Sequence, residues 1–288
     1  MMLNLTIGTP TMTKNPPLDL RLRHATSADR EPIVAWCHTL WDGERDYIED
    51  TWDDWQAEGN LYVGNVSNYD FPVVLIRMRY LSPTEAWFGG LRIHPSLHGH
   101  GIGKFMIAQA EHWARERGCT TLGYMTETRN HTMHYLADKL NFADTGAIYW
   151  HDVELDPHPT GVHHDDSMIE LTQSAQLHAQ HGRYFSGWAI QRLTAERLAH
   201  HAAQHELFVL DDQSAWVIVE HQWDDLYHLS FADGEPMALQ RLVAHIRSIP
   251  QVGVLDVPLW QHTPQADMAD LLNLIPTKEK YDLFERGI

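Results

Sequence analysis

The chain has 288 residues, of which 43% are hydrophobic and 21% are charged, a balance typical of a soluble globular protein with about two domains. Acidic residues number 39 against 21 Lys and Arg, and the net charge of −18 disfavours nucleic acid and anionic membranes as partners. The same charge attracts cationic amines.

Cysteine content and hydrophobicity predict the compartment. Cys37 and Cys119 lack the spacing of a CxxC motif, which argues against a disulfide framework and a cysteine zinc site and favours a reducing cytoplasm. No apolar run approaches the roughly 18 residues of a membrane span, and the N-terminus lacks the apolar region of a signal peptide. We therefore expect a cytoplasmic protein that does not contact membranes.

The first segments predict an arm, a strand and a helix. Residues 1–17 contain polar residues and prolines and are interpreted as a flexible arm. Residues 18–23 alternate apolar and polar side chains, as a half-buried strand does. Ser27 or Asp29 can then cap a helix that carries its apolar residues on one face.

Residues 41–55 combine tryptophans and a tyrosine with a run of acidic residues. Two interpretations remain open. An acidic aromatic wall could hold an ammonium group by its charge and its ring faces. The same residues also fit an amphipathic helix with Trp52 and Trp55 turned inward and a solvated acidic face.

Three strands in meander order are expected at residues 61–66, 73–79 and 87–93. The third contains Gly89-Gly90. Paired glycines inside a strand often mark a bulge or a close approach by a ligand or another backbone, although a plain loop pair would have the same spacing.

A glycine-rich loop, His98-Gly-His-Gly-Ile-Gly103, separates the third strand from a helix that begins near Lys104. Glycines lack Cβ atoms, so successive backbone N–H groups can turn toward one centre, and the N-terminus of the helix adds partial positive charge. That arrangement suits a phosphate or pyrophosphate. The alternative is a flexible turn, which would usually need one glycine rather than three.

Two other glycine motifs do not fit. A P-loop would need glycine where His98 stands and Ser or Thr where Phe105 stands. A dinucleotide fingerprint would need Gly-x-Gly-x-x-Gly near the start of a βαβ unit, whereas this loop spaces its glycines by two and follows several strands.

The rest of the first half predicts four elements. They are a helix at 104–117 that Gly118 ends, a strand at 120–126, a helix within 130–142 and a strand at 145–155. Residues 157–184 are interpreted as a linker with a connecting helix at 169–183. The cluster His163–Asp166 could bind a divalent ion, but four consecutive loop residues seldom form a closed site, so no metal site is predicted.

The element order then starts again, which indicates a repeat on the scale of a domain. The expected elements are strands at 188–193, 207–210, 216–221, 227–231, 252–257 and 281–284 and helices at 194–204, from Pro236 to Ile246 and at 265–274. Residues 231–236 occupy the place of the glycine loop, and their one glycine and two acids would repel a pyrophosphate.

Residues 91–103 resemble the strand and the Arg/Gln-x-x-Gly-x-Gly/Ala acyl-CoA loop of the GNAT N-acetyltransferase superfamily. Residues 130–142 resemble the second signature of that family. Three positions depart from it: His98 replaces Arg or Gln, Asn141 replaces a glycine, and Ala137 replaces the tyrosine that protonates the departing thiolate in many members. Asn141 is an acceptable replacement because Asn tolerates a left-handed helix cap.

The resemblance implies an α/β fold with mixed sheets: two GNAT-like domains in tandem, each a mostly antiparallel sheet flanked by helices. The acetyl-CoA-binding domain would span 18–156 and a degenerate domain 185–288. The second domain could close the substrate side of the first, or contribute stability only. The residues implied for acetyl-CoA are Leu91, Arg92, Ile93, His98, Gly99, His100, Gly101, Ile102, Gly103, Lys104 and Asn130.

Candidate catalytic residues follow from the chemistry. Transfer from a thioester needs positioning, a deprotonated amine and a stabilised oxyanion. Glu85 and Glu127 are the candidate bases, although both also fit surface carboxylates. Tyr135 is kept as a candidate although it lies roughly 200° around the helix from Ala137.

We therefore predict a cytoplasmic N-acetyltransferase, a monomer or weak homodimer, that moves an acetyl group from acetyl-CoA to a primary amine of a small molecule or peptide in a direct ternary complex. The alternative is a catalytically weak or inactive acyl-CoA-binding or interaction protein.

Overall fold

The computed structural model describes residues 19–41, 45–167, 169–263 and 265–288, so the predicted arm at 1–17 lies outside the described residues. The chain forms two compact units. Unit 1 contains the described part of residues 1–124 together with 131–143 and 284–288, and unit 2 contains 125–130 and 144–283. Residues 144–156, which the sequence places in the first domain, thus group with unit 2.

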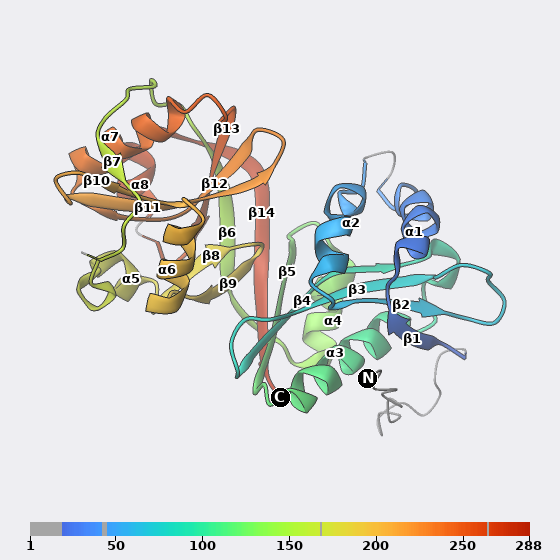
Figure 1. Cartoon of the computed structure of the whole chain (residues 1–288). Helices are drawn as coiled ribbons and strands as arrows, with labels where there is room; N and C mark the ends of the chain where they lie inside the picture. The colour runs from blue at the N-terminus through green and yellow to red at the C-terminus, as the bar shows by residue number, and fades with distance from the viewer. Residues whose placement is uncertain (1–18, 42–44, 168, 264) are drawn as a thin grey trace. The chain divides into compact units, whose positions relative to one another are not determined.

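Unit 1 has a sheet in the order β1-β2-β3-β4-β5, with the end of β14 beside β5 (Figure 1). Its strands are β1 (Arg21–His24), β2 (Leu61–Asn65), β3 (Val74–Tyr80), β4 (Glu85–Ile93) and β5 (Thr121–Glu127), whose last three residues count to unit 2. Its helices are η1 (Ser27–Asp29), α1 (Arg30–Cys37), α2 (Ile48–Ala57), η2 (Pro95–Leu97), α3 (Ile102–Glu116) and α4 (His131–Leu140).

Alternating side chains of the strands fill two cores in unit 1, as the period of two in a strand requires. Tyr62 and Ile76 pack with α3, whereas Val63 and Leu75 pack with α1 and α2. The end of β14 (Leu274–Gly287) completes the first core: the Phe284 ring stacks on Tyr124 with centroids 5.2 Å apart. The N–H of Ile288 donates to the Thr120 carbonyl at 2.8 Å.

The parallel strands β4 and β5 pair over only part of their length. Register partners run from Glu85–Thr121 to Trp87–Gly123, and β4 then continues to Ile93. A bulge follows in β4, because Leu75 and Arg77 of β3 pair with Arg92 and Gly89. Two steps along β3 thus match three along β4, which confirms the bulge expected at the glycine pair.

Unit 2 has a sheet in the order β14-β6-β13-β12-β11-β10-β7 and a hairpin of β8 and β9. Its strands are β6 (Ala143–Val153), β7 (Val162–His163), β8 (Arg183–Ser186), β9 (Ala189–Arg192), β10 (Leu207–Leu210), β11 (Ala215–Trp223), β12 (Leu226–Gly234), β13 (Val254–Trp260) and most of β14. Its helices are η3 (Leu171–Gln173), α5 (Ala175–Ala179), α6 (Ala195–Ala203), α7 (Pro236–Arg247) and α8 (Gln265–Leu271).

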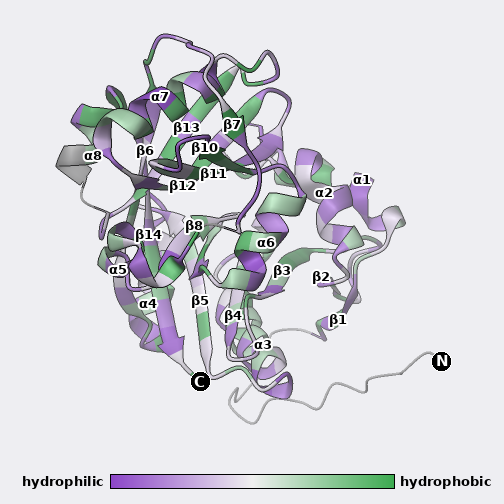
Figure 2. Ribbon diagram, turned by 60° about the vertical axis from the view of Figure 1, so that its left-hand side comes forward, coloured by the Kyte–Doolittle hydropathy of each residue, from purple (hydrophilic) through white to green (hydrophobic). Residues whose placement is uncertain are grey.

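Most predicted elements of unit 2 form, but β7 and β8 lie where a linker and helix were expected, and β14 begins at Leu274 and not at 281. Figure 2 shows α6 changing between hydrophobic and hydrophilic residues along its length, and Leu198 is its buried contact with the sheet. The helix expected at 169–183 is wrong: only η3 and the short α5 form there. Ser174 caps α5 by accepting a hydrogen bond from the Leu177 N–H, and His181 and Gly182 then adopt positive φ, which ends helical structure.

From β9 onward, unit 2 repeats the strand and helix order of unit 1, except that α6 stands where unit 1 has α1 and α2. Its parallel strands β12 and β13 also pair briefly, from Leu226–Val254 to His228–Asp256, before β12 runs on to Gly234. Both units are therefore mixed α/β structures built on one plan. Among the described residues, no helix is both long and apolar enough to cross a membrane.

Candidate active site

The glycine-rich loop adopts the backbone that only glycine enters readily. Gly99 and Gly101 both have φ of +79°, and Gly101 is the residue from which α3 starts. A Cβ atom built on either would meet nothing within 4 Å, so the loop has open space in front of it. Side chains are excluded there by backbone geometry and not by crowding.

The start of α3 offers free donors to this space. Within the described part of the chain, the N–H groups of Ile102, Gly103 and Lys104 have no hydrogen-bond acceptor, as expected in a first helical turn. The Lys104 side chain is exposed in the same turn. Backbone donors, helix charge and a lysine together fit a phosphate or pyrophosphate group.

The two loop histidines stabilise the loop itself. His98, which stands at the Arg/Gln position of the family loop, places Nε2 2.9 Å from the Ile93 carbonyl. His100 places Nδ1 3.0 Å from the His98 carbonyl. Both side chains are exposed but turn back onto the backbone, so their role is in holding the turn.

Gly103 allows α4 to approach α3. A Cβ at this position would lie 3.3 Å from the Leu136 side chain and 3.6 Å from that of Ile93. Asn141 ends α4 with φ of +56°, the left-handed cap that the sequence predicts. The two family signatures thus pack against each other through the last glycine of the loop.

Gly90 forms the bulge in β4. Its φ is +60°, and a Cβ atom there would lie 2.3 Å from the Trp55 ring. The bulge takes Gly90 and Leu91 out of regular pairing with β3. Bulges often redirect backbone groups beside active sites, and this one lies on the strand that leads into the glycine loop.

Arg92 contacts the loop before α2 through a buried ion pair. Its Nε lies 2.8 Å from Oδ2 of Asp46, which is only 2% exposed, and its guanidinium lies over the rings of Trp41 and Tyr47. Burial alone would raise the pKa of Asp46, but the charge of Arg92 and hydrogen bonds from Arg92, Trp41 and Ile48 lower it. The Arg92 side chain is therefore structural, and its assigned part in acetyl-CoA binding is confined to its backbone.

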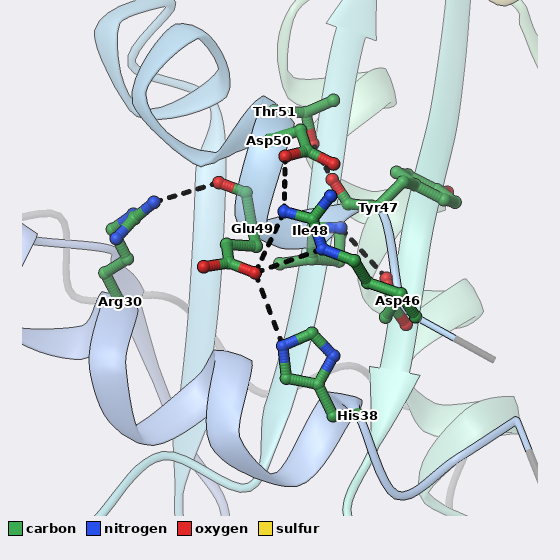
Figure 3. A network of polar contacts seen from close by, with 9 residues as sticks. Arg30, His38, Asp46, Tyr47, Ile48, Glu49, Asp50 and Thr51 are labelled. Carbon is green, nitrogen blue, oxygen red and sulfur yellow. Dashed lines mark hydrogen bonds and ion pairs between the residues drawn. The ribbon is translucent and has the colours of Figure 1, made fainter. Parts of the chain in front are cut away.

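Most acids of α2 and of the described part of the turn before it are paired with basic residues, which supports the amphipathic-helix interpretation of 41–55. Figure 3 shows Glu49 at the centre of a polar network, where its carboxylate accepts from Arg45 at 3.0 Å and pairs with His38 at 3.5 Å. Asp50 accepts from the same arginine at 2.7 Å. Trp52 is 1% exposed and fills the core under α1.

The three candidate catalytic residues lie apart from the loop or are engaged elsewhere. Glu85 begins β4, four residues before Gly89 and so about 13 Å along the strand, and it accepts a hydrogen bond from Ser82. Glu127 falls in unit 2 and is ion-paired with Arg129. Tyr135 is 60% exposed beside Lys139, while Ala137 is fully buried. These positions give no geometric support for the three predicted roles.

The family resemblance implies that Asn130 contacts acetyl-CoA. Asn130 directly precedes α4 and belongs to unit 2. Its N–H donates to the Glu127 carbonyl at 2.9 Å, which closes the turn between β5 and α4.

A hydrogen-bonded network beside the loop was not predicted from the sequence. Nδ1 of His94 lies 2.7 Å from Oγ of Ser96, which in turn hydrogen-bonds the Tyr69 hydroxyl. Burial and then the charge of His98 lower the pKa of His94, so its imidazole is neutral near pH 7. Tyr69 stands 27 residues from Ser96 without any motif, and only the sheet brings them together.

The fold of unit 1 and this loop are those of a GNAT-type domain, and comparison with known proteins supports that assignment. The sequence model of the acetyltransferase (GNAT) family matches residues 28–142. These residues hold the bulged strand, the glycine loop and α4. The chain thus contains a GNAT acetyltransferase domain at residues 28–142.

Individual relatives extend the match over both units. An aminoglycoside N(6')-acetyltransferase type 1 of Stenotrophomonas maltophilia is 25% identical over 147 residues, which are 47% of this chain and 94% of that protein. A GCN5-related N-acetyltransferase from Sphaerobacter thermophilus is 13% identical with a TM-score of 0.64, covering 93% of this chain and 95% of that one. A tandem GNAT protein from the clavulanic acid biosynthesis pathway is 12% identical with a TM-score of 0.60, covering 93% and 98%. The two structures show that the tandem GNAT fold spans nearly the whole chain.

Proposed function

We propose that the protein transfers an acetyl group from acetyl-CoA to a primary amine, and that unit 1 binds the acetyl-CoA. The observation that carries the proposal is the pairing of two left-handed glycines with the free N–H groups of the first turn of α3. Gly99, Gly101 and Gly103 make room for a pyrophosphate, and Lys104 adds a positive charge beside it.

The bulge supplies the second part of the site. Acetyl-CoA brings an acyl group that is already activated as a thioester. Gly90 and the amides of Leu91 to Ile93 lie on the strand next to the loop, where backbone N–H groups can stabilise the oxyanion. Trp55 packs against Gly90 and fixes the position of this backbone.

His94 is a better candidate base than the two glutamates. It follows the bulged strand directly, its lowered pKa keeps it able to accept a proton, and Ser96 and Tyr69 hold the ring through Nδ1. Because the amine must lose a proton before or during attack, this hydrogen-bonded network offers a path by which that proton can leave. The transfer then needs only one ternary complex and no acyl-enzyme.

Cationic acceptors agree with the net charge of −18, and the relative from S. maltophilia is described as acting on aminoglycosides. We therefore propose a multiply charged amine over a neutral one. The protein would act in the cytoplasm, as a monomer or weak homodimer.

The test measures release of the CoA thiol by the full chain with acetyl-CoA and a panel of amines that includes a diamine, spermidine, a peptide N-terminus and an aminoglycoside with a free 6′-amine. We expect turnover with at least one cationic amine and initial-rate plots that intersect when both substrates are varied. Failure of millimolar acetyl-CoA to stabilise the protein against heat would overturn the proposal.

A second candidate is an acyl-CoA-binding protein with little or no turnover. It is favoured by the buried Ala137 and the exposed Tyr135, which leave α4 without a tyrosine at the position of the family's usual acid. Stabilisation by acetyl-CoA without thiol release across the panel would support this candidate.

A further inference from the structure

Unit 2 carries a patch of carboxylates and aromatic rings on one face of its sheet. The members come from β6, β12, β13, β14, the end of β11 and the turn between β8 and β9: Trp150, Asp152, Trp188, Trp223, His228, Asp256, Glu279 and Tyr281. We call this set the carboxylate–aromatic patch. None of these residues was assigned a role from sequence.

Strand register places the members together. Asp256 pairs with Asp152 on one side and with His228 on the other. Trp150 is two residues before Asp152, and Tyr281 two residues after Glu279, so each pair shares a face. The rings of Trp150 and Tyr281 lie 5.9 Å apart, which brings these two faces into contact.

Trp188 adopts an unfavourable backbone to reach the patch. Its φ is +64° in the two-residue turn after Ser186, where Gly or Asn would be least strained. Its ring lies 5.4 Å from Trp150, 5.7 Å from Tyr281 and 6.3 Å from Trp223, to which it is nearly parallel. The turn alone does not call for a tryptophan, and strain of this kind is often kept where a side chain serves a site.

His228 is a buried polar group without a partner. It is 1% exposed, its Nδ1 has no hydrogen bond among the described residues, and its ring lies 5.2 Å from Trp150 and 5.8 Å from Trp188. Burial lowers its pKa to about 3, so the ring is neutral. An unpartnered imidazole among these rings is a ready hydrogen-bond partner for a ligand.

Within the described part of the chain, the carboxylates of the patch, Asp152, Asp256 and Glu279, form no ion pair with a basic side chain. Burial and the charge of Glu127 raise the pKa of Glu279, and the charge of Arg129 opposes that rise in part. Lys280 extends from the opposite face, 2.9 Å from Asp282 and over the Tyr149 ring. Burial, the charge of Asp152, a hydrogen bond with Asp152 and the charge of Glu279 raise the pKa of Asp256 to about 7.

We propose that the carboxylate–aromatic patch is a binding site for an organic cation with two or more ammonium groups. The Asp152–Asp256 pair attracts one ammonium and Glu279 another, and the faces of Trp188 and Trp223 hold the chain between them by cation–π contact. A neutral His228 accepts an N–H hydrogen bond. The patch lies wholly in unit 2, so the proposal goes beyond acetyl transfer by unit 1 and does not depend on it.

The test is calorimetric titration of the full chain with spermidine at low and at physiological salt. We expect saturable binding at one site, and a Kd raised at least tenfold by Asp256→Asn and by Trp188→Asn. In the second variant Asn suits the positive φ, which offsets part of the packing lost with the ring, and thermal unfolding of the variant checks that its fold is maintained. Asp270→Asn removes one exposed charge of unit 2 on α8 and is expected to leave Kd unchanged.

Several results would overturn the proposal. They are non-saturable spermidine binding, an equal loss of spermidine affinity in Asp270→Asn, and binding of Mg²⁺ or Ca²⁺ without any binding of spermidine. Gly101→Glu separates this site from the acetyl-CoA site, because spermidine binding is expected to survive that substitution in unit 1 while acetyl-CoA binding does not.

Discussion

Asp46 of unit 1 and Asp256 of unit 2 have similar aromatic neighbours, but their pKa values are shifted in opposite directions. Each is an aspartate among aromatic rings. Asp46 is held by Arg92 and has a lowered pKa, whereas Asp256 faces Asp152 and has a raised one. A buried acid with a matched arginine is part of the framework, because both charges are already satisfied. An acid whose only charged neighbours are other acids retains the capacity to bind a cation.

The two units also differ at the junction between a strand and the following helix, which is β4–α3 in unit 1 and β12–α7 in unit 2. In unit 1, Gly101 leads into α3 with free N–H groups. In unit 2, the N–H of Glu235 donates to the Ser214 carbonyl at 3.0 Å, and Pro236 at the start of α7 has no N–H. A Cβ on Gly234 would lie 2.5 Å from the backbone of Ala215, so this junction is already filled.

The space between the diverging strands of unit 2 is also closed. The cavity between β12 and β13 measures about 20 Å³, enough for a water molecule, and Gln176, Gln180 and Phe185 line it. One fold plan is therefore used twice, with an open strand-to-helix junction in unit 1 and a filled one in unit 2.

The largest effect is expected from Asp46→Asn. Neutralising Asp46 leaves the Arg92 charge buried without a partner, which costs about 3 to 5 kcal/mol of unfolding free energy. Urea denaturation measures the loss. Asp54→Asn on the exposed side of α2 is the control and is expected to change stability by less than about 0.5 kcal/mol. Equal stability of the two variants would refute the distinction between matched and unmatched acids.

Gly101→Glu is expected to weaken acetyl-CoA binding at least 100-fold, about 2.7 kcal/mol, because it places a carboxylate at the free N–H groups of α3. Gly118→Glu is the matched control. Gly118 also has a positive φ, +84°, and also has open space around its Cβ, but it follows the other end of the same helix. Acetyl-CoA is titrated into both variants, and equal affinities would contradict the role proposed for the loop.

Gly90→Ala is expected to destabilise unit 1 by about 2 to 3 kcal/mol, since the new methyl group meets the Trp55 ring at a positive φ. Thermal unfolding measures this loss, and the rate of acetyl transfer is expected to fall more than the affinity for acetyl-CoA. Gly89→Ala next to it meets nothing within 4 Å and provides the control. A neutral effect of Gly90→Ala would mean that the bulge is not needed.

The smallest effect on stability is expected from Asp256→Asn, and this effect depends on pH. The folded-state pKa of about 7 lies above that of an unfolded aspartate, so the stability contributed by the protonated acid is present below about pH 4 and is lost as pH rises through 7. The neutral amide avoids that loss. Because Asp256 is half-buried, the gain at pH 8 is limited to about 1 kcal/mol, roughly 2 °C in Tm.

The same comparison at pH 4 provides the check on sign. There the wild-type carboxyl is protonated in the folded state and about half protonated in the unfolded state, so the two melting temperatures are expected to differ by only a small part of the gain at pH 8. The groups that face Asp256 are Asp152 from β6, His228 from β12 and Glu279 from β14, and the His228 ring is neutral. A gain that is constant from pH 4 to pH 8 would show that the carboxyl charge is not its cause.

Local pattern was sufficient for the elements that carry the glycine loop. Strand-like runs of residues predict β2 to β4, the glycine pair predicts the bulge, and Asn141 predicts the end of α4, because each depends on a few neighbouring residues. Helical spacing gave a wrong prediction at 169–183. There Ser174 starts the short helix α5, and a turn at Gly182 follows it.

Contacts between distant residues were beyond reach of the sequence. Asp46 and Arg92 are 46 residues apart, and Asp152 meets Asp256 only because β6 pairs with β13 in one register. A shift of one residue would turn every side chain of a strand to the other face, so the patch in unit 2 is fixed by pairing and not by any motif.

The end of β14 gives unit 1 an unusual order of assembly. Phe284 and Ile288 complete the sheet beside Tyr124 and Thr120, which are made about 160 residues earlier. While the chain is being synthesised, unit 1 must wait for all of unit 2 to leave the ribosome before its own core can close. The proposed acetyl-CoA site is therefore completed only after residues 284–288 have been made, and a chain that ended before them would contain the loop without a completed unit around it.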